Sequence, residues 1–303
     1  MTVEIVDVSV NEAHEYAAIN APDQEQSWGV FVGLASTGDP YDFVPTEVKP
    51  SAANHREVAS GDVVLVAGRY PDEVGGGAVL IYAAADLHAG GSVVVDATAP
   101  LNLEPDEVPL FVTAANTNGD LMLDLVVVTN SAVHIRPCVL GECEAQRFEL
   151  DDYPAISQAA ITDIGPEPSV ELVVMNDASA TTYSFASGMP EVVGPQIQVE
   201  PVSSFATGDI DADGTPDLLL GTTSGGVAVK LIADDGALKE TWRRPESGAV
   251  RDIQSGDFGE EMAVDIAYLV ARDGATDVVF LWDVEPIPNN TNPLSLSLIH
   301  ISE

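Results

Sequence analysis

Acidic side chains recur at regular spacing in one short loop of this 303-residue chain. Asp209, Asp211, Asp213 and Asp217 stand at positions 1, 3, 5 and 9 of the loop, and a glycine at position 6 permits a sharp turn. Carboxylates this close repel one another unless a cation lies between them. A calcium ion, which takes about six to eight oxygen ligands, suits such a loop, and the carbonyl group of Thr215 adds a further oxygen. The sequence therefore predicts a calcium loop, and the alternative is an acidic turn that binds no ion.

The residues after this loop indicate a strand. Leu218, Leu219 and Leu220 follow the last aspartate directly. The loop matches the first half of an EF-hand loop, but position 12 is Leu220 and not the bidentate glutamate of that motif. We therefore expect a calcium loop that precedes a strand. The ion is expected to be structural, because ligands at positions 1, 3, 5, 7 and 9 nearly fill its coordination sphere.

The same combination of an acidic residue and an apolar run recurs along the chain, which indicates an internal repeat. The last three intervals between these residues are 47, 46 and 48 residues, whereas the first is 62 and holds about 15 extra residues. A unit of this length with three or four strands has the size of a propeller blade. The acidic residues that open the runs are Asp62, Asp124, Glu171, Asp217 and Asp265.

The loop before Asp124 is the second-best copy of the acidic loop. It places Asn116, Asn118, Asp120 and Asp124 at positions 1, 3, 5 and 9, and all four side chains offer oxygen atoms. Leu121 stands in place of the glycine at position 6. Two further loops keep acids at positions 1, 5 and 9 only. Their acids are Asp163, Glu167 and Glu171 in one loop and Asp257, Glu261 and Asp265 in the other.

Between the loops the chain consists of short apolar or alternating runs separated by Gly, Pro, Asn and Asp, which is typical of strands and turns. No segment of ten or more residues combines a helical period with caps. The predicted fold class is all-β, a β-propeller with about six visible blades. The predicted units are residues 1–48, 49–109, 110–156, 157–202, 203–250 and 251–285.

The segment Phe205–Gly221 resembles an FG-GAP (VCBS-type) repeat, the blade unit of integrin α-subunit propellers and of many bacterial secreted proteins. The family pattern is Asp-x-Asp/Asn-x-Asp-Gly-x-x-Asp, followed by Leu and an apolar run that ends in Gly. It is met in full from Asp209 to Gly221. The other loops match in part, so the resemblance covers roughly residues 50–285.

This resemblance implies a β-propeller whose calcium ions stiffen the loops between blade strands. The resemblance does not imply one function, because these propellers serve adhesion, lectin-like binding and scaffolding alike. We expect an extracellular, periplasmic or cell-surface module that binds a protein or glycan without catalysis, in adhesion or as a scaffold. Propellers of this family commonly have seven blades. A truncated seven-bladed ring, and a chain that is part of a longer one, are therefore expected.

The two ends of the chain differ from the repeats. The start, Met1–Asp7, lacks the basic and apolar regions of a signal peptide, which would have been lost with the N-terminus if the chain is a fragment. Residues 286–295 are typical of a linker. Residues 296–303, Leu-Ser-Leu-Ile-His-Ile-Ser-Glu, resemble translated transposase-adapter sequence from sequencing libraries. We therefore exclude this last segment from the predicted fold.

The charge balance is strongly acidic, with 49 Asp and Glu against 11 Lys and Arg and a formal net charge of −38. Such a field repels nucleic acid and anionic membranes and concentrates cations. No apolar run approaches the roughly 18 residues of a membrane span, so no membrane insertion is expected. A secreted calcium-binding protein and adaptation to a salt-rich milieu both explain the acidity, and the sequence leaves both open.

The only cysteines, Cys138 and Cys143, enclose the turn Val139-Leu-Gly-Glu142. A turn at this glycine would bring the two thiols within bridging distance, so we expect a disulfide that closes a small surface loop. Free thiols and a metal site are the alternatives.

Catalytic residue types do not form a known catalytic motif. No nucleophile elbow, zinc-binding histidine pair, phosphate loop or dinucleotide fingerprint occurs. His134 alternates with apolar neighbours, which indicates a surface or half-buried position on a strand, and Trp242 is expected in a core or between blades. We predict no enzymatic role. The alternative is a polysaccharide-acting enzyme, or its accessory domain, with a carboxylate pair as catalyst.

Overall fold

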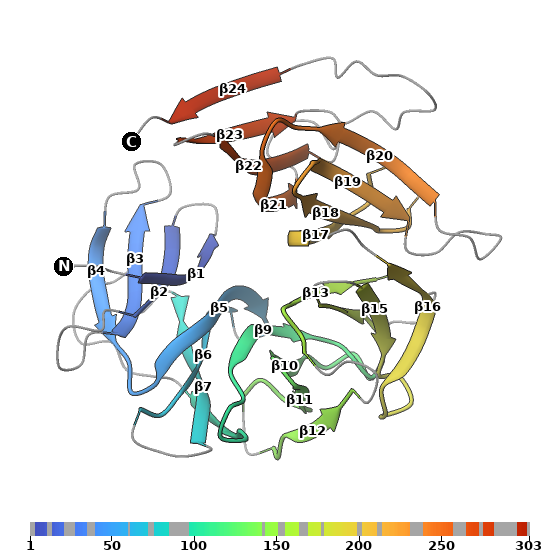
Figure 1. The fold of residues 1–303 in the computed structure, drawn as a ribbon. Helices are drawn as coiled ribbons and strands as arrows, with labels where there is room; N and C mark the ends of the chain where they lie inside the picture. The colour runs from blue at the N-terminus through green and yellow to red at the C-terminus, as the bar shows by residue number, and fades with distance from the viewer. Residues whose placement is uncertain are drawn as a thin grey trace. The chain divides into compact units, whose positions relative to one another are not determined.

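A computed structural model of the chain forms two compact units, Met1–Ile156 and Ser157–Glu303, each of which is described by itself (Figure 1). The prediction from the sequence, one propeller domain over residues 1–285, stays a prediction. The predicted linker, 286–295, lies outside the described residues. The structure describes residues 4–10, 14–20, 28–34, 40–59, 61–71, 76–84, 97–140, 143–150, 155–163, 169–176, 179–198, 202–210, 214–230, 239–256, 265–272, 275–281 and 296–301.

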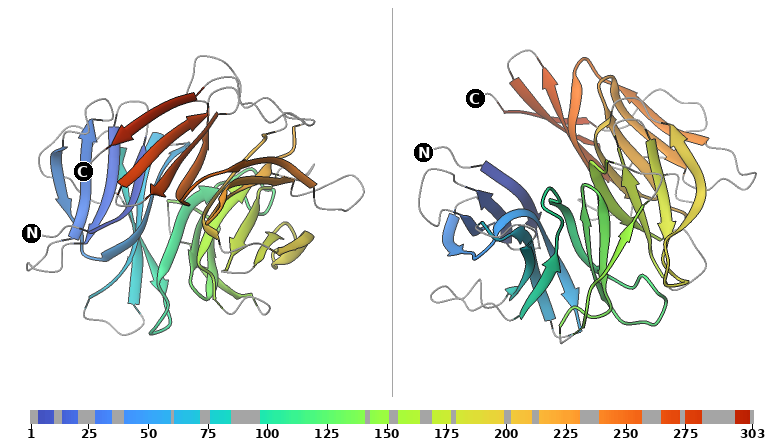
Figure 2. Two further views of the ribbon diagram at one scale, coloured as in Figure 1. Left: turned by 45° about the horizontal axis from the view of Figure 1, so that its top comes forward. Right: turned by 60° about the horizontal axis from the view of Figure 1, so that its bottom comes forward.

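The unit Met1–Ile156 contains three antiparallel sheets of four strands. Each strand pairs with the next strand in the sequence, so each sheet is an antiparallel meander (Figure 2). The strands are β1 (Glu4–Val10), β2 (His14–Asn20), β3 (Trp28–Leu34) and β4 (Pro40–Pro45); β5 (Lys49–Val58), β6 (Gly61–Arg69), β7 (Gly76–Ala83) and β8 (Ala97–Asn102); and β9 (Pro109–Ala115), β10 (Asp124–Thr129), β11 (Ala132–Arg136) and β12 (Gln146–Glu149).

The unit Ser157–Glu303 repeats this plan with three further four-stranded meanders. Its strands are β13 (Gln158–Thr162), β14 (Glu171–Met175), β15 (Ser179–Ser184) and β16 (Glu191–Gln198); β17 (Val202–Gly208), β18 (Asp217–Thr222), β19 (Gly225–Lys230) and β20 (Lys239–Pro245); and β21 (Ala249–Gly256), β22 (Asp265–Arg272), β23 (Ala275–Leu281) and β24 (Leu296–Ile301).

The last strand, β24, lies in the segment that the sequence analysis excluded from the fold. It pairs with β23, from Leu296 opposite Leu281 to Ile301 opposite Thr276. The run Leu-Ser-Leu-Ile-His-Ile is rich in apolar and β-branched residues and so suits a strand at the edge of a sheet. The structure therefore includes this segment in the sixth sheet, while its origin in an adapter stays a prediction.

The strands β6, β10, β14 and β18, each the second strand of its sheet, are buried on both faces, which explains why their apolar runs are continuous and do not alternate with polar residues. In β6, Leu65 packs in one cluster with Val112 and Leu125 of the next sheet. Its neighbours Val64 and Val66 belong to the opposite cluster, which also contains side chains of β4 and β7. Neighbouring sheets within this unit are therefore joined by apolar cores on both sides of β6.

Strand β18 shows the same arrangement in the second unit. Leu218 and Leu220 share a cluster with Val173 of β14, whereas Leu219 packs in the cluster of Trp242 and the sheet β21–β24. Trp242 is 7% exposed, so it lies in a core as predicted. The apolar run after the loop of Asp217 thus supplies a central strand that packs against the neighbouring sheets on both of its faces.

Candidate metal-binding loops

The loop between β9 and β10 folds back on itself through its own side chains. The Oδ1 atom of Asn116 accepts a hydrogen bond of 2.9 Å from the amide of Gly119. Asn118 Oδ1 accepts one of 2.9 Å from the amide of Asp120, and Asp120 Oδ1 accepts one of 2.8 Å from the amide of Met122. These turns hold the three predicted ligand side chains at positions 1, 3 and 5 against the loop. A carbonyl or carboxylate oxygen has two lone pairs, so each can accept such a bond and still bind a cation.

Asp124, at position 9, is the first residue of β10 and is fully buried. Its Oδ2 atom accepts hydrogen bonds from the amide of Thr117, at 3.0 Å, and from the hydroxyl group of the same residue. No group in the described part of the chain donates to its Oδ1 atom, which is buried as well. An unsatisfied buried carboxylate oxygen is costly. This oxygen is therefore the atom in the loop that most needs a partner.

The pKa of Asp124 is raised above its ordinary value, chiefly because burial disfavours the charged form. The nearby charge of Asp120 raises it further, whereas the two hydrogen bonds from Thr117 act in the opposite direction. A cation beside this pair of carboxylates would favour the charged form of Asp124 and so offset both unfavourable effects. The residues present therefore fit an oxygen-binding cation such as calcium.

Position 6 of this loop requires a left-handed backbone. Leu121 has φ = 66°, and it is the only residue other than glycine with positive φ in the described part of the chain. In the second loop the same position is Gly214, with φ = 86°. The turn geometry at position 6 is therefore common to both loops, and in the first loop a leucine adopts it at a steric cost.

The loop between β17 and β18 shares the bond from the amide of position 2 to the acid at position 9, whereas the residue at position 1 accepts from position 6 and not from position 4. Asp209 Oδ2 accepts a bond of 2.8 Å from the amide of Gly214, and Asp217 Oδ2 accepts one of 3.0 Å from the amide of Ile210. Asp217 is the first residue of β18 and is fully buried, and Thr215 is half-buried. Asp211 and Asp213, at positions 3 and 5, lie outside the described residues.

The two weaker loops are described only in part. Asp163 is exposed after β13, and Glu171 is buried as the first residue of β14. Asp265 begins β22, and nothing is described of its side chain. The remaining predicted ligands, Glu167, Asp257 and Glu261, lie outside the described residues. In all four repeats, therefore, the acid at position 9 is the first residue of the second strand of a sheet.

Among the described residues, no three His, Cys, Asp or Glu side chains lie close enough together to hold a metal ion. In the loop before β10, two of the four predicted ligands are the amide side chains of Asn116 and Asn118, which leaves two carboxylates. In the loop before β18, only Asp209 and Asp217 of the four aspartates are described. The distances among the four aspartates of that loop therefore stay outside the described structure.

A buried ionic network in the sheet β9–β12 was missed by the sequence analysis. Glu107, in the loop before β9, is fully buried. Its Oε1 atom accepts a hydrogen bond of 2.7 Å from the hydroxyl group of Thr129 and lies 2.9 Å from Nε2 of His134. Its Oε2 atom accepts a bond of 2.8 Å from the amide of Glu104 and lies 3.4 Å from Nε of Arg147. Glu107 thus ties its loop to the strands β11 and β12.

These contacts control the ionisation of Glu107. Burial, the largest effect, would raise its pKa, but hydrogen bonds from His134, the Glu104 amide and Thr129, together with the charge of His134, hold the pKa at about 2. His134 is only 2% exposed, so the predicted surface or half-buried position was wrong. The reason is the buried carboxylate, which gives the ring a partner inside the fold. Glu107 lies outside the regular spacing of the loops, so the sequence held no signal for it.

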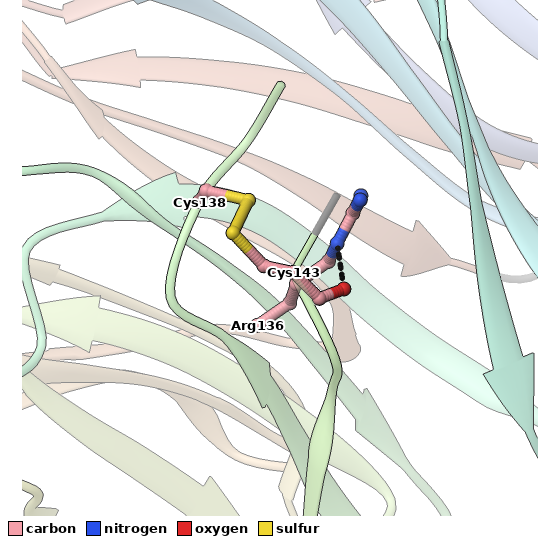
Figure 3. Close-up of a disulfide and its surroundings, with 3 residues drawn as sticks. All are labelled: Arg136, Cys138 and Cys143. Atoms are coloured by element: carbon pink, nitrogen blue, oxygen red, sulfur yellow. Dashed lines mark hydrogen bonds between the residues drawn. A yellow bond between two sulfur atoms is a disulfide. The ribbon is translucent and has the colours of Figure 1, made fainter. Parts of the chain in front are cut away.

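A disulfide joins Cys138 and Cys143 in the connection between β11 and β12, with 6.1 Å between the two Cα atoms (Figure 3). Nε of Arg136, at the end of β11, donates a hydrogen bond of 2.9 Å to the carbonyl oxygen of Cys143. Between the cysteines, Val139 is buried and Leu140 is exposed. The connection is therefore fixed to its strand by a covalent bond, a hydrogen bond and one apolar anchor.

Comparisons with known proteins place the chain by its fold. Neither a family model nor a curated protein sequence matches it. The chain is similar to a solved structure of BBS1N in complex with ARL6DN, soaked with mercury. The two chains are 12% identical with a TM-score of 0.57, over 95% of this chain and 77% of that chain. At this identity the likeness shows the fold alone, and that fold is a β-propeller. The predicted fold class, an all-β protein of the β-propeller type, is confirmed.

The described residues contain no helix with the length and apolar character needed to cross a membrane.

Proposed function

We propose that this chain is a calcium-stabilised β-propeller of the FG-GAP type that acts outside the cytoplasm as a non-enzymatic binding or scaffold module for a protein or glycan. One observation carries the calcium part of the proposal: the buried Oδ1 atom of Asp124 has no hydrogen-bond partner among the described residues. A fold that buries such an oxygen next to Asp120 is expected to supply a cation. The fully buried Asp217 stands at the same place in the second loop.

The residues that would hold the ions are those at positions 1, 3, 5 and 9. In the first loop they are Asn116, Asn118, Asp120 and Asp124. In the second loop they are Asp209, Asp211, Asp213 and Asp217, with the carbonyl oxygen of Thr215 as a further ligand. The bound ion supplies positive charge that offsets carboxylate repulsion. Because only the folded loop brings these oxygens together, the binding free energy adds to the free energy of folding.

The binding role is supported by the fold and by the neighbour. BBS1N was solved in complex with ARL6DN, which is a property of that protein and an example of a propeller that engages another chain. The disulfide between Cys138 and Cys143 supports an oxidising compartment, since such bonds are rare in the cytosol. Millimolar calcium outside cells would keep even weak loops of this kind occupied.

Isothermal titration of the chelator-treated protein with calcium tests the proposal. We expect the wild-type chain to bind at least two ions and the variants Asp124→Asn and Asp217→Asn to lose one site each. Asp106→Asn is the matched control, because Asp106 is an exposed aspartate in the unit of Asp124 and takes no part in the loops. Calcium binding that is absent from the wild type, or equal in all four proteins, would overturn the calcium assignment.

A further inference from the structure

Exposed apolar side chains gather at one end of the sheet β9–β12. The described part of Met1–Ile156 has four large exposed apolar residues, namely Val108, Leu121, Met122 and Leu140. Leu121 and Met122 lie in the loop between β9 and β10, and they are 80% and 62% exposed. Leu140, in the disulfide loop, is 41% exposed. We call Leu121, Met122 and Leu140 the loop-tip surface.

The register of the sheet brings these two loops to the same end. Asp124, the first residue of β10, lies opposite Ala115, the last residue of β9. Leu125 lies opposite Arg136, the last residue of β11, and Gln146 of β12 lies opposite Ile135. Both connections therefore leave the sheet where β9 and β11 end. Val108 precedes the start of β9 and belongs to the opposite end.

Both loops are anchored in one apolar cluster, which fixes the direction of their tips. Val139 belongs to the cluster of Leu125 and Val127, and Leu123 packs against the same cluster. Each anchor is the sequence neighbour of an exposed residue, Met122 in one loop and Leu140 in the other. Met122 and Leu140 therefore stay exposed, because the adjacent residues Leu123 and Val139 already fill the apolar cluster.

The loop-tip surface is also held rigid before any partner arrives. The turn bonds of Asn116, Asn118 and Asp120 fix the first loop, and the disulfide fixes the second. A loop whose backbone is already fixed loses less conformational entropy when a partner buries it. Exposed apolar residues grouped on fixed loops are typical of protein interaction sites, whereas singly scattered ones are ordinary.

We propose that the loop-tip surface docks a protein partner that offers an apolar pocket bordered by Lys or Arg side chains. This inference rests on the proposed binding function and names its surface. The exposed Glu144, which is not a proposed calcium ligand, flanks the apolar tip of the disulfide loop. This residue and the net charge of −38 favour a basic partner and oppose both a second copy of this chain and an anionic membrane.

A defined peptide tests this surface. The probe is a fluorescently labelled amphipathic peptide of alternating Leu and Lys blocks, and its companion carries Ser in place of each Leu. Fluorescence anisotropy with the full chain in calcium would compare the wild type, the triple variant Leu121→Ser/Met122→Ser/Leu140→Ser, and the control Met189→Ser/Val192→Ser. Met189 and Val192 are 61% and 55% exposed but lie in the other unit, so the control removes comparable apolar surface elsewhere.

We expect the Leu/Lys peptide to bind the triple variant about ten-fold more weakly than the wild type, while the control keeps wild-type affinity. The Ser/Lys peptide should bind all three proteins equally weakly, through charge alone. Equal affinity of the Leu/Lys peptide for the wild type and the triple variant would overturn the assignment of the loop-tip surface as the docking site, without affecting the proposed binding function. Binding to neutral phosphatidylcholine vesicles that depends on the three residues, without peptide binding, would replace the protein partner with a lipid surface. If the triple variant loses its folded circular dichroism spectrum, Met122→Ser alone gives the same comparison without a change in charge.

Discussion

Asp217 accepts a hydrogen bond of 3.0 Å from the backbone amide of Ile210, across the loop that the two residues close. In the other unit, Asp124 accepts a bond of 3.0 Å from the amide of Thr117. In both cases the acid begins the second strand of its sheet, and the amide belongs to the second residue of the loop. A strand residue that fastens the start of its own loop positions the other oxygens before an ion binds. Such preorganisation lowers the cost of binding.

Replacing Leu121 by glycine should stabilise the protein. Leu121 has φ = 66°, a conformation that costs an L-residue about 1 kcal/mol and costs glycine little. We expect Leu121→Gly to raise the free energy of unfolding by about 0.5–1 kcal/mol in urea denaturation. Met122→Gly is the control. Its neighbouring, exposed position has no positive φ, so glycine there should be neutral or destabilising. Equal losses in both variants would show that the loop does not hold Leu121 in this conformation.

Glu107 should contribute pH-dependent stability. Its pKa of about 2 in the folded chain lies below the ordinary value of 4.5, so the ionised carboxylate stabilises the fold fully above about pH 4.5. This contribution is lost as the pH falls towards 2. We expect Glu107→Gln to lower the free energy of unfolding by about 1–3 kcal/mol near pH 7. The difference from wild type should shrink below pH 4.

Urea denaturation at pH 7, 4 and 3 would measure this difference. Glu149→Gln is the matched control, because Glu149 also pairs with Arg147, at 2.6 Å, but its side chain is 70% exposed. An exposed ion pair contributes about 0–1 kcal/mol, so this variant should stay close to wild type at each pH. A loss in Glu107→Gln that is the same at all three pH values would argue against the ionic role of Glu107.

Removal of the disulfide should lower stability modestly. The bond joins residues only five positions apart, so the chain-entropy estimate for such a short loop is about 2 kcal/mol. We expect the double variant Cys138→Ser/Cys143→Ser to lose about this amount, and reduction of the wild type to have the same effect. Reductant should leave the melting temperature of the double variant unchanged. If it also leaves the wild type unchanged, the two cysteines are not bridged in solution.

The sequence predicted those parts of the fold that depend on a short local pattern repeated along the chain. Asp124 and Asp217 were found by their spacing, and each is the buried first residue of a second strand. The apolar runs that follow them are buried on both faces. Their short length favours a strand over a buried helix, which would need at least about 10 residues. The repeat therefore predicted the all-β propeller fold class, because the same acidic residue and apolar strand recur in successive units.

The features that the sequence did not predict depend on contacts between distant residues. Glu107 and His134 are 27 positions apart and meet only because the loop before β9 folds over β11. The strand β24 was excluded because of its resemblance to adapter sequence, yet its apolar pattern pairs with β23. Leu121 adopts a left-handed backbone at position 6, where the loop pattern has glycine. The sequence therefore ranked this loop as a poorer match to the pattern, although its side chains form the expected turn hydrogen bonds. None of these three features follows the repeat along the sequence, so the repeat could not predict them.

Thermal unfolding with and without calcium tests the central claim most directly. The chelator-treated chain would be melted at low salt, first alone and then with calcium at about 100 times the dissociation constant, with magnesium and potassium as controls. The account predicts stabilisation of about 2.7 kcal/mol per site, a rise of at least about 5 °C, and reversal by fresh chelator. Asp124→Asn/Asp217→Asn should lose most of this rise. A melting temperature that calcium does not change, or that potassium raises equally, would contradict the account and leave a salt-adapted acidic turn in its place.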